Sequence, residues 1–242
     1  PYVWGFTQLA QGCGLIAPKA VVVQGSSAYW MSQKQFFVNS GNGVEVIPCT
    51  VWDIVFQNLN TAYANNIRAA SNSQFNEITW YYPSQASNSG ENDSYVTYNT
   101  KLQEWDYGSL NRCAWIDQSV LGGPIGGCTD GYVYQHETSN DAAGSAINAS
   151  LTTGYFTLSE AEDLVFVDWM FPDMKWGTYS GSQTANVQFT FNVLNYLGDT
   201  PRTYGPYTVN QQSPYIQLRM RGRYLQIIVS SSDTGSFWRM GK

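Results

Sequence analysis

The feature that most limits the fold is the shortness of the apolar segments. Stretches such as KAVVVQGSS, AYWMS and VEVIP hold a few aromatic or β-branched residues before Gly, Pro, Asn or Ser interrupts them. Segments of this length form strands, and the turn residues between them join neighbouring strands into antiparallel meanders. Composition agrees, because 15% of the residues are aromatic and 12% are charged, which suits pleated sheets with many turns. The sequence therefore predicts an all-β protein.

The first part of the chain contains a rough internal repeat. Residues 28–49 align with residues 78–108, since each segment offers an aromatic pair, a polar turn, a second strand and a closing strand. DGYVYQHET (130–138) resembles the start of a third copy. A spacing of about 50 residues is that of kelch-sized propeller blades, so partial β-propeller blades are predicted over residues 1–140. Two and a half blades cannot close a ring, so we expect further blades from sequence on the N-terminal side or from other chains. The start at PYVWG without Met and the end at RMGK also lead us to expect that both ends are cut from a longer polypeptide.

Two other segments complete the predicted organisation. In TVWDIVFQNLNTAYANN the apolar residues recur at helical spacing, and Thr50 with Asp53 resembles a capping box. An amphipathic helix over residues 51–65 is therefore predicted between blades. The polar stretch HETSNDAAGS (136–145) is interpreted as a linker, and the longer alternating segments beyond it predict a β-sandwich-like domain over residues 145–242.

Charge and cysteine usage argue against two functional classes, nucleic-acid binding by most of the surface and zinc binding. The net charge is −6. Residues 1–218 hold seven Lys or Arg against seventeen Asp or Glu, giving −10, and residues 219–242 hold five against one, giving +4, so most of the surface should repel nucleic acid. One histidine, His136, and four widely spaced cysteines do not fit a zinc site. Buried free thiols are expected, although the spacing leaves a disulfide open.

Membrane and catalytic signatures are not found either. No apolar run reaches the roughly 18 residues that span a bilayer. Asp106 and Asp117 each lie near a tryptophan, which could raise a carboxyl pKa, and SEAEDL supplies Glu160, Glu162 and Asp163. Asp turns between strands and a solvated acidic turn explain these residues without catalysis, and His136 has no nucleophile motif beside it. We therefore predict a non-enzyme with no catalytic residue, cofactor or metal.

Three arginines alternate near the end of the chain, in RMRGRYLQIIVSSS. On one strand, Arg219, Arg221 and Arg223 would project from the same face at intervals of about 7 Å. We interpret them as an outer stripe that contacts a neighbouring subunit or lines a channel. A direct contact with DNA is the weaker interpretation.

The segment that follows, SSDTGSFW, approaches the S-x-D-x-G-x-T-W Asp-box that sialidase-type propellers repeat. It has Phe237 where the motif has Thr, and it occurs once. We interpret it as a hairpin turn in which Asp233 and Gly235 fit tight-turn geometry. Phe237 and Trp238 would then re-enter a core.

Several stretches, taken in order, resemble the tail hub or nozzle proteins of short-tailed bacteriophages, the group that includes packaged-DNA stabilisation proteins. They are AYWMSQKQFFV…VIPCTVWDIVFQNLN, FNEITWYYPS…ENDSYVTYN…WDYG, AWID, DGYVYQHE and RMRGRYLQIIVSSSDTGSFWRMGK. The resemblance implies a propeller and further β-domains repeated as a homo-oligomeric ring of six below the portal and adaptor. The ring would lie in the virion tail after assembly in the bacterial host cytoplasm, contact other tail proteins, and let double-stranded DNA pass without sequence specificity.

A glycan-binding or glycan-hydrolysing propeller that acts on host surface polysaccharide is the alternative. The Asp-box-like turn and the abundant aromatic residues favour it. A sugar-stacking platform could be built from strand aromatics, although packing in a core explains the same residues; they are Trp80, Tyr81, Tyr82, Tyr95 and Tyr98.

Overall fold

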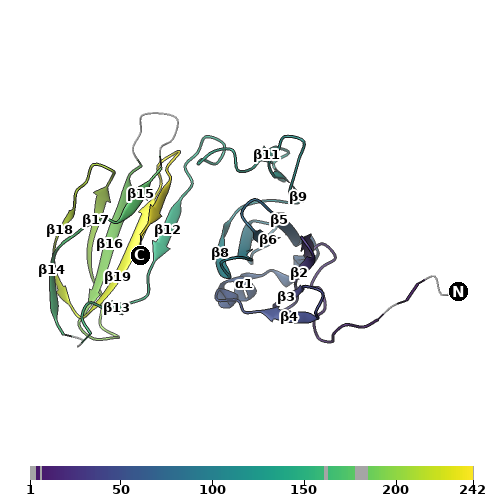
Figure 1. Cartoon of the computed structure of the whole chain (residues 1–242), viewed down its shortest axis with the longest axis horizontal. Coiled ribbons are helices and arrows are strands. Elements are labelled where there is room, and N and C mark those ends of the chain that lie inside the picture. The colour runs from purple at the N-terminus through teal and green to yellow at the C-terminus, as the bar shows by residue number, and fades with distance from the viewer. Residues whose placement is uncertain (1–3, 6, 161–162, 178–184, 242) are drawn as a thin grey trace. The chain divides into compact units, whose positions relative to one another are not determined.

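The computed structural model describes residues 4–5, 7–160, 163–177 and 185–241 (Figure 1). These residues form several antiparallel sheets joined by turns, with two short helices, so the protein is mostly β as predicted. The chain divides into two compact units, residues 1–138 and 139–242. The division falls within the polar stretch 136–145.

The N-terminal unit contains three antiparallel meanders that follow one another along the chain. Two have four strands and one has three, and the strand order in each is the order in the sequence. The strands are β1 (Val21–Gln24), β2 (Ser27–Met31), β3 (Phe36–Asn39), β4 (Val44–Ile47), β5 (Arg68–Asn72), β6 (Glu77–Tyr82), β7 (Ser94–Asn99), β8 (Glu104–Ser109), β9 (Ala114–Ile116), β10 (Ile125–Gly127) and β11 (Val133–Gln135). The first strands of successive sheets are neighbours, because β5 contacts both β1 and β9.

The internal repeat corresponds to these sheets in part. The aligned segments 28–49 and 78–108 each supply the last three strands of a four-stranded sheet, with the aromatic pairs in β2 and β6. The third copy is placed wrongly by the sequence argument, because residues 130–138 contain β11, the last strand of the third sheet. Its earlier strands, AWI and IGG, are too short to show a pattern. No closed ring of sheets is found in the described residues.

Trp80 joins the first two sheets through the core of the N-terminal unit. Its side chain is 0% exposed, and its ring centroid lies 4.7 Å from that of Phe36 on β3. The indole Nε1 donates a hydrogen bond of 3.1 Å to the carbonyl of Ala20, just before β1. Burial of aromatic area is the largest favourable contribution to such a core, so the two sheets form one packed body.

The predicted helix over 51–65 is wrong in its length and its cap. The chain forms α1 (Trp52–Asn58) and then a separate 3-10 helix, η1 (Thr61–Asn66). Leu59 between them is extended and bridges to Ser84, which interrupts the helical hydrogen bonds. The N-cap is Val51, with no side-chain hydrogen bond, so Thr50 and Asp53 do not form a capping box.

The described residues of the C-terminal unit form one five-stranded sheet and two strand pairs. The large sheet has the order β12-β19-β16-β17, with β13 also paired to β19; the small ones are β14-β18 and β15-β20. The strands are β12 (Ala149–Thr152), β13 (Phe156–Thr157), β14 (Val165–Met170), β15 (Met174–Trp176), β16 (Val187–Leu194), β17 (Arg202–Val209), β18 (Ile216–Gly222), β19 (Tyr224–Ser231) and β20 (Trp238–Met240).

One hydrophobic core lies between the sheets of this unit. Phe189 and Val193 on β16 pack with Leu218 and Met220 on β18, and all four side chains are buried. Both strands alternate buried with more exposed residues, which is the pattern of a strand with one face against a core. The unit therefore has two layers that share a single core.

Candidate functional site

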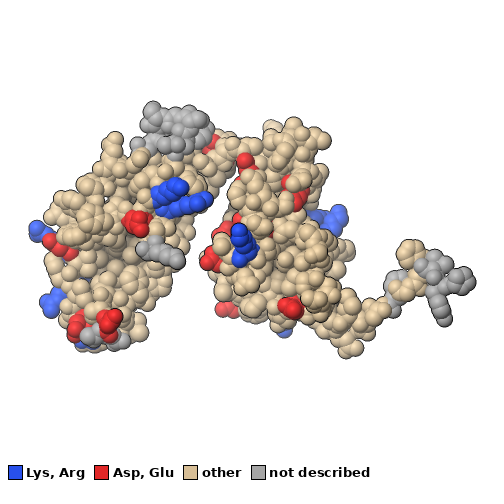
Figure 2. Space-filling model, viewed as in Figure 1, with Lys and Arg blue, Asp and Glu red and all other residues tan. Residues whose placement is uncertain are grey.

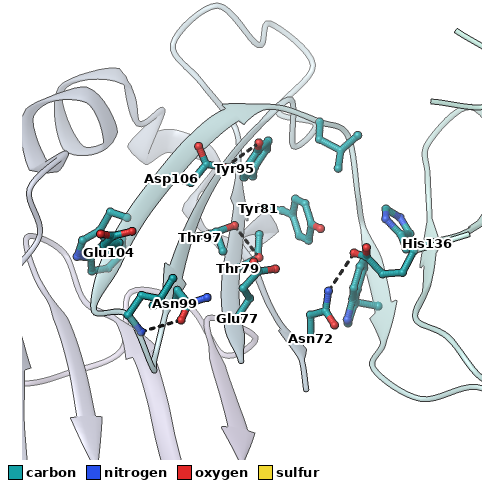
Figure 3. Close-up of a pocket in the computed structure, with 15 residues that line it drawn as sticks. Asn72, Glu77, Thr79, Tyr81, Tyr95, Thr97, Asn99, Glu104, Asp106 and His136 are labelled. Carbon is teal, nitrogen blue, oxygen red and sulfur yellow. Dashed lines mark hydrogen bonds between the residues drawn. The ribbon is translucent and has the colours of Figure 1, made fainter. Parts of the chain in front are cut away.

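A hollow of about 380 Å³ lies on the N-terminal unit, over one face of the β5–β8 sheet (Figure 3). Glu77, Thr79 and Tyr81 reach it from β6, because alternate residues of a strand share a face. Trp115 on β9, and the segment that follows β11, line the same hollow. The hydroxyl oxygens of Thr79 and Thr97 are hydrogen-bonded to each other at 2.8 Å.

Tyr81 is the central aromatic residue of the hollow. Figure 3 shows its ring between Tyr95 and Asp106 on one side and Asn72 and His136 on the other. The side chain is 3% exposed, and no hydrogen bond joins its hydroxyl to another described residue. Burial raises the pKa of both Tyr81 and Tyr95 well above the ordinary value, so both phenols remain neutral hydrogen-bond donors at physiological pH.

Four carboxylates line the hollow, Glu77, Glu104, Asp106 and Glu137, and few hydrogen-bond donors accompany them. Tyr95 donates its hydroxyl hydrogen to Asp106 Oδ2 at 3.2 Å, and Asn72 Nδ2 donates to Glu137 Oε1 at 3.0 Å. No hydrogen bond joins the Glu77 carboxylate to a described residue. Burial raises the pKa of Glu77, and the nearby charges of Glu137 and Asp106 raise it further. No Lys or Arg is among the lining residues, so the lining itself carries net negative charge.

His136 lies at the edge of the hollow as a hydrogen-bonded neutral imidazole. Arg112 Nε donates to His136 Nε2 at 2.9 Å, and the His136 ring centroid lies 4.6 Å from that of Trp115. Burial and the Arg112 charge lower the pKa of His136 to about 4. Because Nε2 already accepts the Arg112 hydrogen, this nitrogen is not free to take a proton from a substrate.

The carboxylates named from the sequence are not brought together. Asp106 lines the hollow, whereas Asp117 accepts hydrogen bonds from the amide of Ser73 at 2.9 Å and from the nearby Ser71 and Ser73 hydroxyls, which fixes the turn after β5. Glu160 and Asp163 belong to the C-terminal unit, where both are exposed, and Glu162 lies outside the described residues. Sequence reasoning missed Glu77, although EITWYY alternates it with Thr79 and Tyr81.

The three arginines do not form one stripe on one strand. Arg219 and Arg221 are exposed on β18 and alternate with buried core residues. Strand β18 ends at Gly222, and Arg223 lies at the junction where the chain crosses into β19 of the other sheet. Its guanidinium stacks over the Tyr196 ring at 5.0 Å. The single-strand prediction therefore fails for Arg223, because a change of sheet interrupts the alternation.

Arg219 and Arg221 belong to an exposed face that also carries aromatic residues. Phe166 of β14 lies opposite Arg221, and Trp169 lies opposite Gln217. Phe166 is 58% exposed and Trp169 is 54% exposed. No hydrogen bond or ion pair joins the side chain of Arg219 or Arg221 to another described residue. We name Phe166, Trp169, Arg219 and Arg221 the β14–β18 face.

The Asp-box-like segment forms a turn but not a hairpin. Asp233 Oδ2 accepts hydrogen bonds from the amide of Asn186 at 3.1 Å and from its Nδ2 at 2.9 Å, and Gly235 has a φ of 73°. The turn connects β19 to β20, which pairs with β15 and not with β19. Trp238 packs against the core and donates Nε1 to Ser231 Oγ at 2.8 Å, so it stabilises the unit as expected.

The described residues were also compared with the requirements of a membrane span and a metal site, and the sequence with known proteins. Within the described residues, no helix is long and apolar enough to cross a membrane, and no group of three His, Cys, Asp or Glu side chains is placed to hold a metal ion. The four cysteines are free and partly buried. No protein-family model and no curated protein sequence matches the chain.

Proposed function

We propose that this chain is a non-enzymatic structural component of a short-tailed bacteriophage tail. It would form part of the hub or nozzle ring below the portal and adaptor, in the virion, and extend the channel that retains and later ejects the genome. The observation that carries the proposal is the β14–β18 face. Aromatic side chains more than half exposed beside unpaired arginines are typical of surfaces that another protein covers.

The organisation of the N-terminal unit supports the same function. Three meanders whose first strands are neighbours, β1 with β5 and β5 with β9, resemble consecutive propeller blades. The layered C-terminal unit would be the sandwich-like domain of the ring. Blades of this kind pack against blades on both sides, so neighbouring sequence or neighbouring subunits would complete the circle.

Charge is also compatible with passage of DNA. The N-terminal unit holds five Lys or Arg against ten Asp or Glu, giving −5. Figure 2 shows Lys and Arg as scattered groups among uncharged residues on the face in view. Tight binding to duplex DNA needs several basic side chains that neutralise phosphates together. A weakly charged, acidic surface therefore lets DNA move past without holding it.

Substitution of the β14–β18 face tests the proposal. We expect the double change Phe166→Ser and Trp169→Ser in the full-length protein to prevent ring assembly and particle completion, while the C-terminal unit still folds. Both residues lie on the exposed side of β14, so the core is not altered. Native mass spectrometry of the purified protein and counts of infectious particles measure the outcome.

Leu197→Ser provides a matched control. Leu197 is 68% exposed in the same unit but lies in the turn after β16, away from β14 in the sequence. Rings and particles should form normally with this variant. Normal assembly of the double variant would contradict the proposal that this face is a subunit contact.

A glycan-hydrolysing protein is the second candidate, and the hollow favours it. A carboxyl group with a raised pKa, Glu77, lies near the carboxylate of Asp106, and aromatic rings surround both. Glycosidases use two carboxyl groups of this kind, one as acid and one as base or nucleophile. Release of reducing sugar from host polysaccharide, abolished by Glu77→Gln and by Asp106→Asn, would support it. No release by the wild-type chain would exclude it.

A further inference from the structure

No described Lys or Arg forms an ion pair with the carboxylates of the hollow on β5–β8. Glu77, Asp106 and Glu137 are close enough for the charges of the last two to raise the pKa of Glu77. Arg112 lies nearby but forms no ion pair with these carboxylates among the described residues. Its Nε donates to His136, its Nη1 donates to the carbonyl of Asn111, and its guanidinium stacks over Tyr134 at 4.6 Å. Carboxylates arranged in this way attract a positive ligand.

Tyr81 gives a second and independent indication of a ligand. Its side chain is 97% buried, yet its hydroxyl has no hydrogen-bond partner among the described residues and lines the hollow. The hydroxyl oxygen itself stays open to the hollow, so its hydrogen bonds are left to water or to a ligand there. The hydroxyl therefore fits a polar group that enters the hollow from outside.

From these observations we infer that the hollow binds an organic cation, a guanidinium or alkylammonium group. It would lie between Glu77, Asp106 and Glu137, hydrogen-bond the Tyr81 hydroxyl oxygen, and face the rings of Tyr95 and Trp115. Aromatic faces and carboxylates both attract such a group. This inference is independent of the proposed tail assembly.

The other ligand classes fit the hollow less well. The carboxylates are not clustered tightly enough for a metal ion among the described residues. A neutral sugar would leave the repulsion between the carboxylates in place. A hollow of about 380 Å³ accommodates a side chain of the size of arginine, and it falls at the small end of ligand sites.

Calorimetric titration of the full chain with N-acetyl-L-arginine amide tests the inference. The matched neutral probe is N-acetyl-L-citrulline amide, which has nearly the same shape but carries a urea in place of the guanidinium. We expect the arginine probe to bind at least about tenfold more tightly, because only the cation gains charge-assisted hydrogen bonds and contact with the ring faces. Equal affinity for the two probes would overturn the inference, and so would no detectable binding of either.

Variants locate the site. Glu77→Gln and Glu137→Gln should each weaken binding of the arginine probe by about tenfold, and Tyr81→Phe by about threefold. Glu45→Gln removes the same charge from the exposed face of β4, outside the hollow, and should leave the affinity unchanged. If Glu45→Gln and Glu77→Gln lost the same affinity for the arginine probe, the net charge of the chain alone would attract the probe, and the proposed site would be overturned. The comparison of the two probes on the wild-type chain needs no variant to fold.

Sedimentation distinguishes two sources of the cation. If an arginine of a second copy fills the hollow, the wild-type chain self-associates, and both the arginine probe and Glu77→Gln reverse this. If a free amine or guanidine is the ligand, the probe binds without any change in sedimentation. Both results support a cation site, and the probe comparison alone decides whether the site exists.

Discussion

The carboxylate of Glu77 lies in the hollow without a hydrogen-bond donor from any described residue, and burial raises its pKa above the ordinary 4.5. The folded state therefore holds the proton more tightly than the unfolded state, so stability falls as pH rises from 4.5 through the folded pKa. We expect Glu77→Gln to raise the free energy of unfolding at pH 7, and this gain should disappear below pH 4.5. Urea denaturation at both pH values measures it. A less stable variant at pH 7 would contradict this account.

His136 should affect the pH dependence of stability in the opposite sense to Glu77. Burial and Arg112 lower its pKa from 6.5 to about 4, so the unfolded state binds the proton first. This contribution to stability is complete above pH 6.5 and is lost as pH falls toward 4. An NMR titration should find the imidazole midpoint near 4. Arg112→Gln should raise the midpoint only in part, because burial is the larger cause; an ordinary midpoint in the wild-type chain would refute the Arg112–His136 arrangement.

At the level of single residues, the sequence indicated part of the hollow. Asp106 and several aromatic residues attracted attention because they adjoin one another in WDYG and ITWYY. Glu137 could not be assigned to the site, since it lies after β11 and meets Asn72 of β5 only in the folded chain. Proximity between residues 65 positions apart is a property of the fold and has no local signal.

Among the elements, the junction between β18 and β19 depends on Gly222. A Cβ at this position would collide with Val193 Cγ1 and come within 3.0 Å of the Leu194 carbonyl oxygen. We expect Gly222→Ala to lower the free energy of unfolding of the C-terminal unit by about 1–3 kcal/mol, as overpacking of a core does. Gly154→Ala is the control, because no atom lies within 4 Å of its Cβ position. Similar denaturation midpoints for both variants would contradict this reason for Gly222.

Strands were predicted better than their connections. Alternation identified β16 and β18, since buried and exposed residues follow one another in both. The crossing between sheets at Arg223 was missed because the alternation continues through RMRGRYLQ without a Pro or an Asn. The predicted helix was too long for a related reason, since the apolar spacing does not reveal that Leu59 pairs with Ser84.

For the whole molecule, two separate cores predict two unfolding transitions. One core is built around Trp80 and Phe36, the other around Phe189 and Leu218, and no buried residue belongs to both. Brief proteolysis should cleave within residues 139–145, and each fragment should retain its own cooperative transition in calorimetry. Two independently stable units would be contradicted if the intact chain showed a single unfolding transition and neither fragment showed a cooperative transition after cleavage.

The all-β class of the whole chain could be predicted from the sequence. Closure of the proposed ring could not. Short strands, frequent turns and the repeat of about 50 residues specify antiparallel meanders. In the proposed ring, closure would depend on surfaces such as the β14–β18 face, where Phe166 and Trp169 are exposed beside Arg221. The partner of such a surface is not encoded in the periodicity of the strands that form it.

Electron microscopy of intact particles tests the central claim most directly. A label on the full-length protein should lie in a ring coaxial with the portal, between the adaptor and the end of the tail. The account predicts that the label repeats around this axis with the symmetry of the ring. A stable monomer in solution together with particles that lack the label would contradict it.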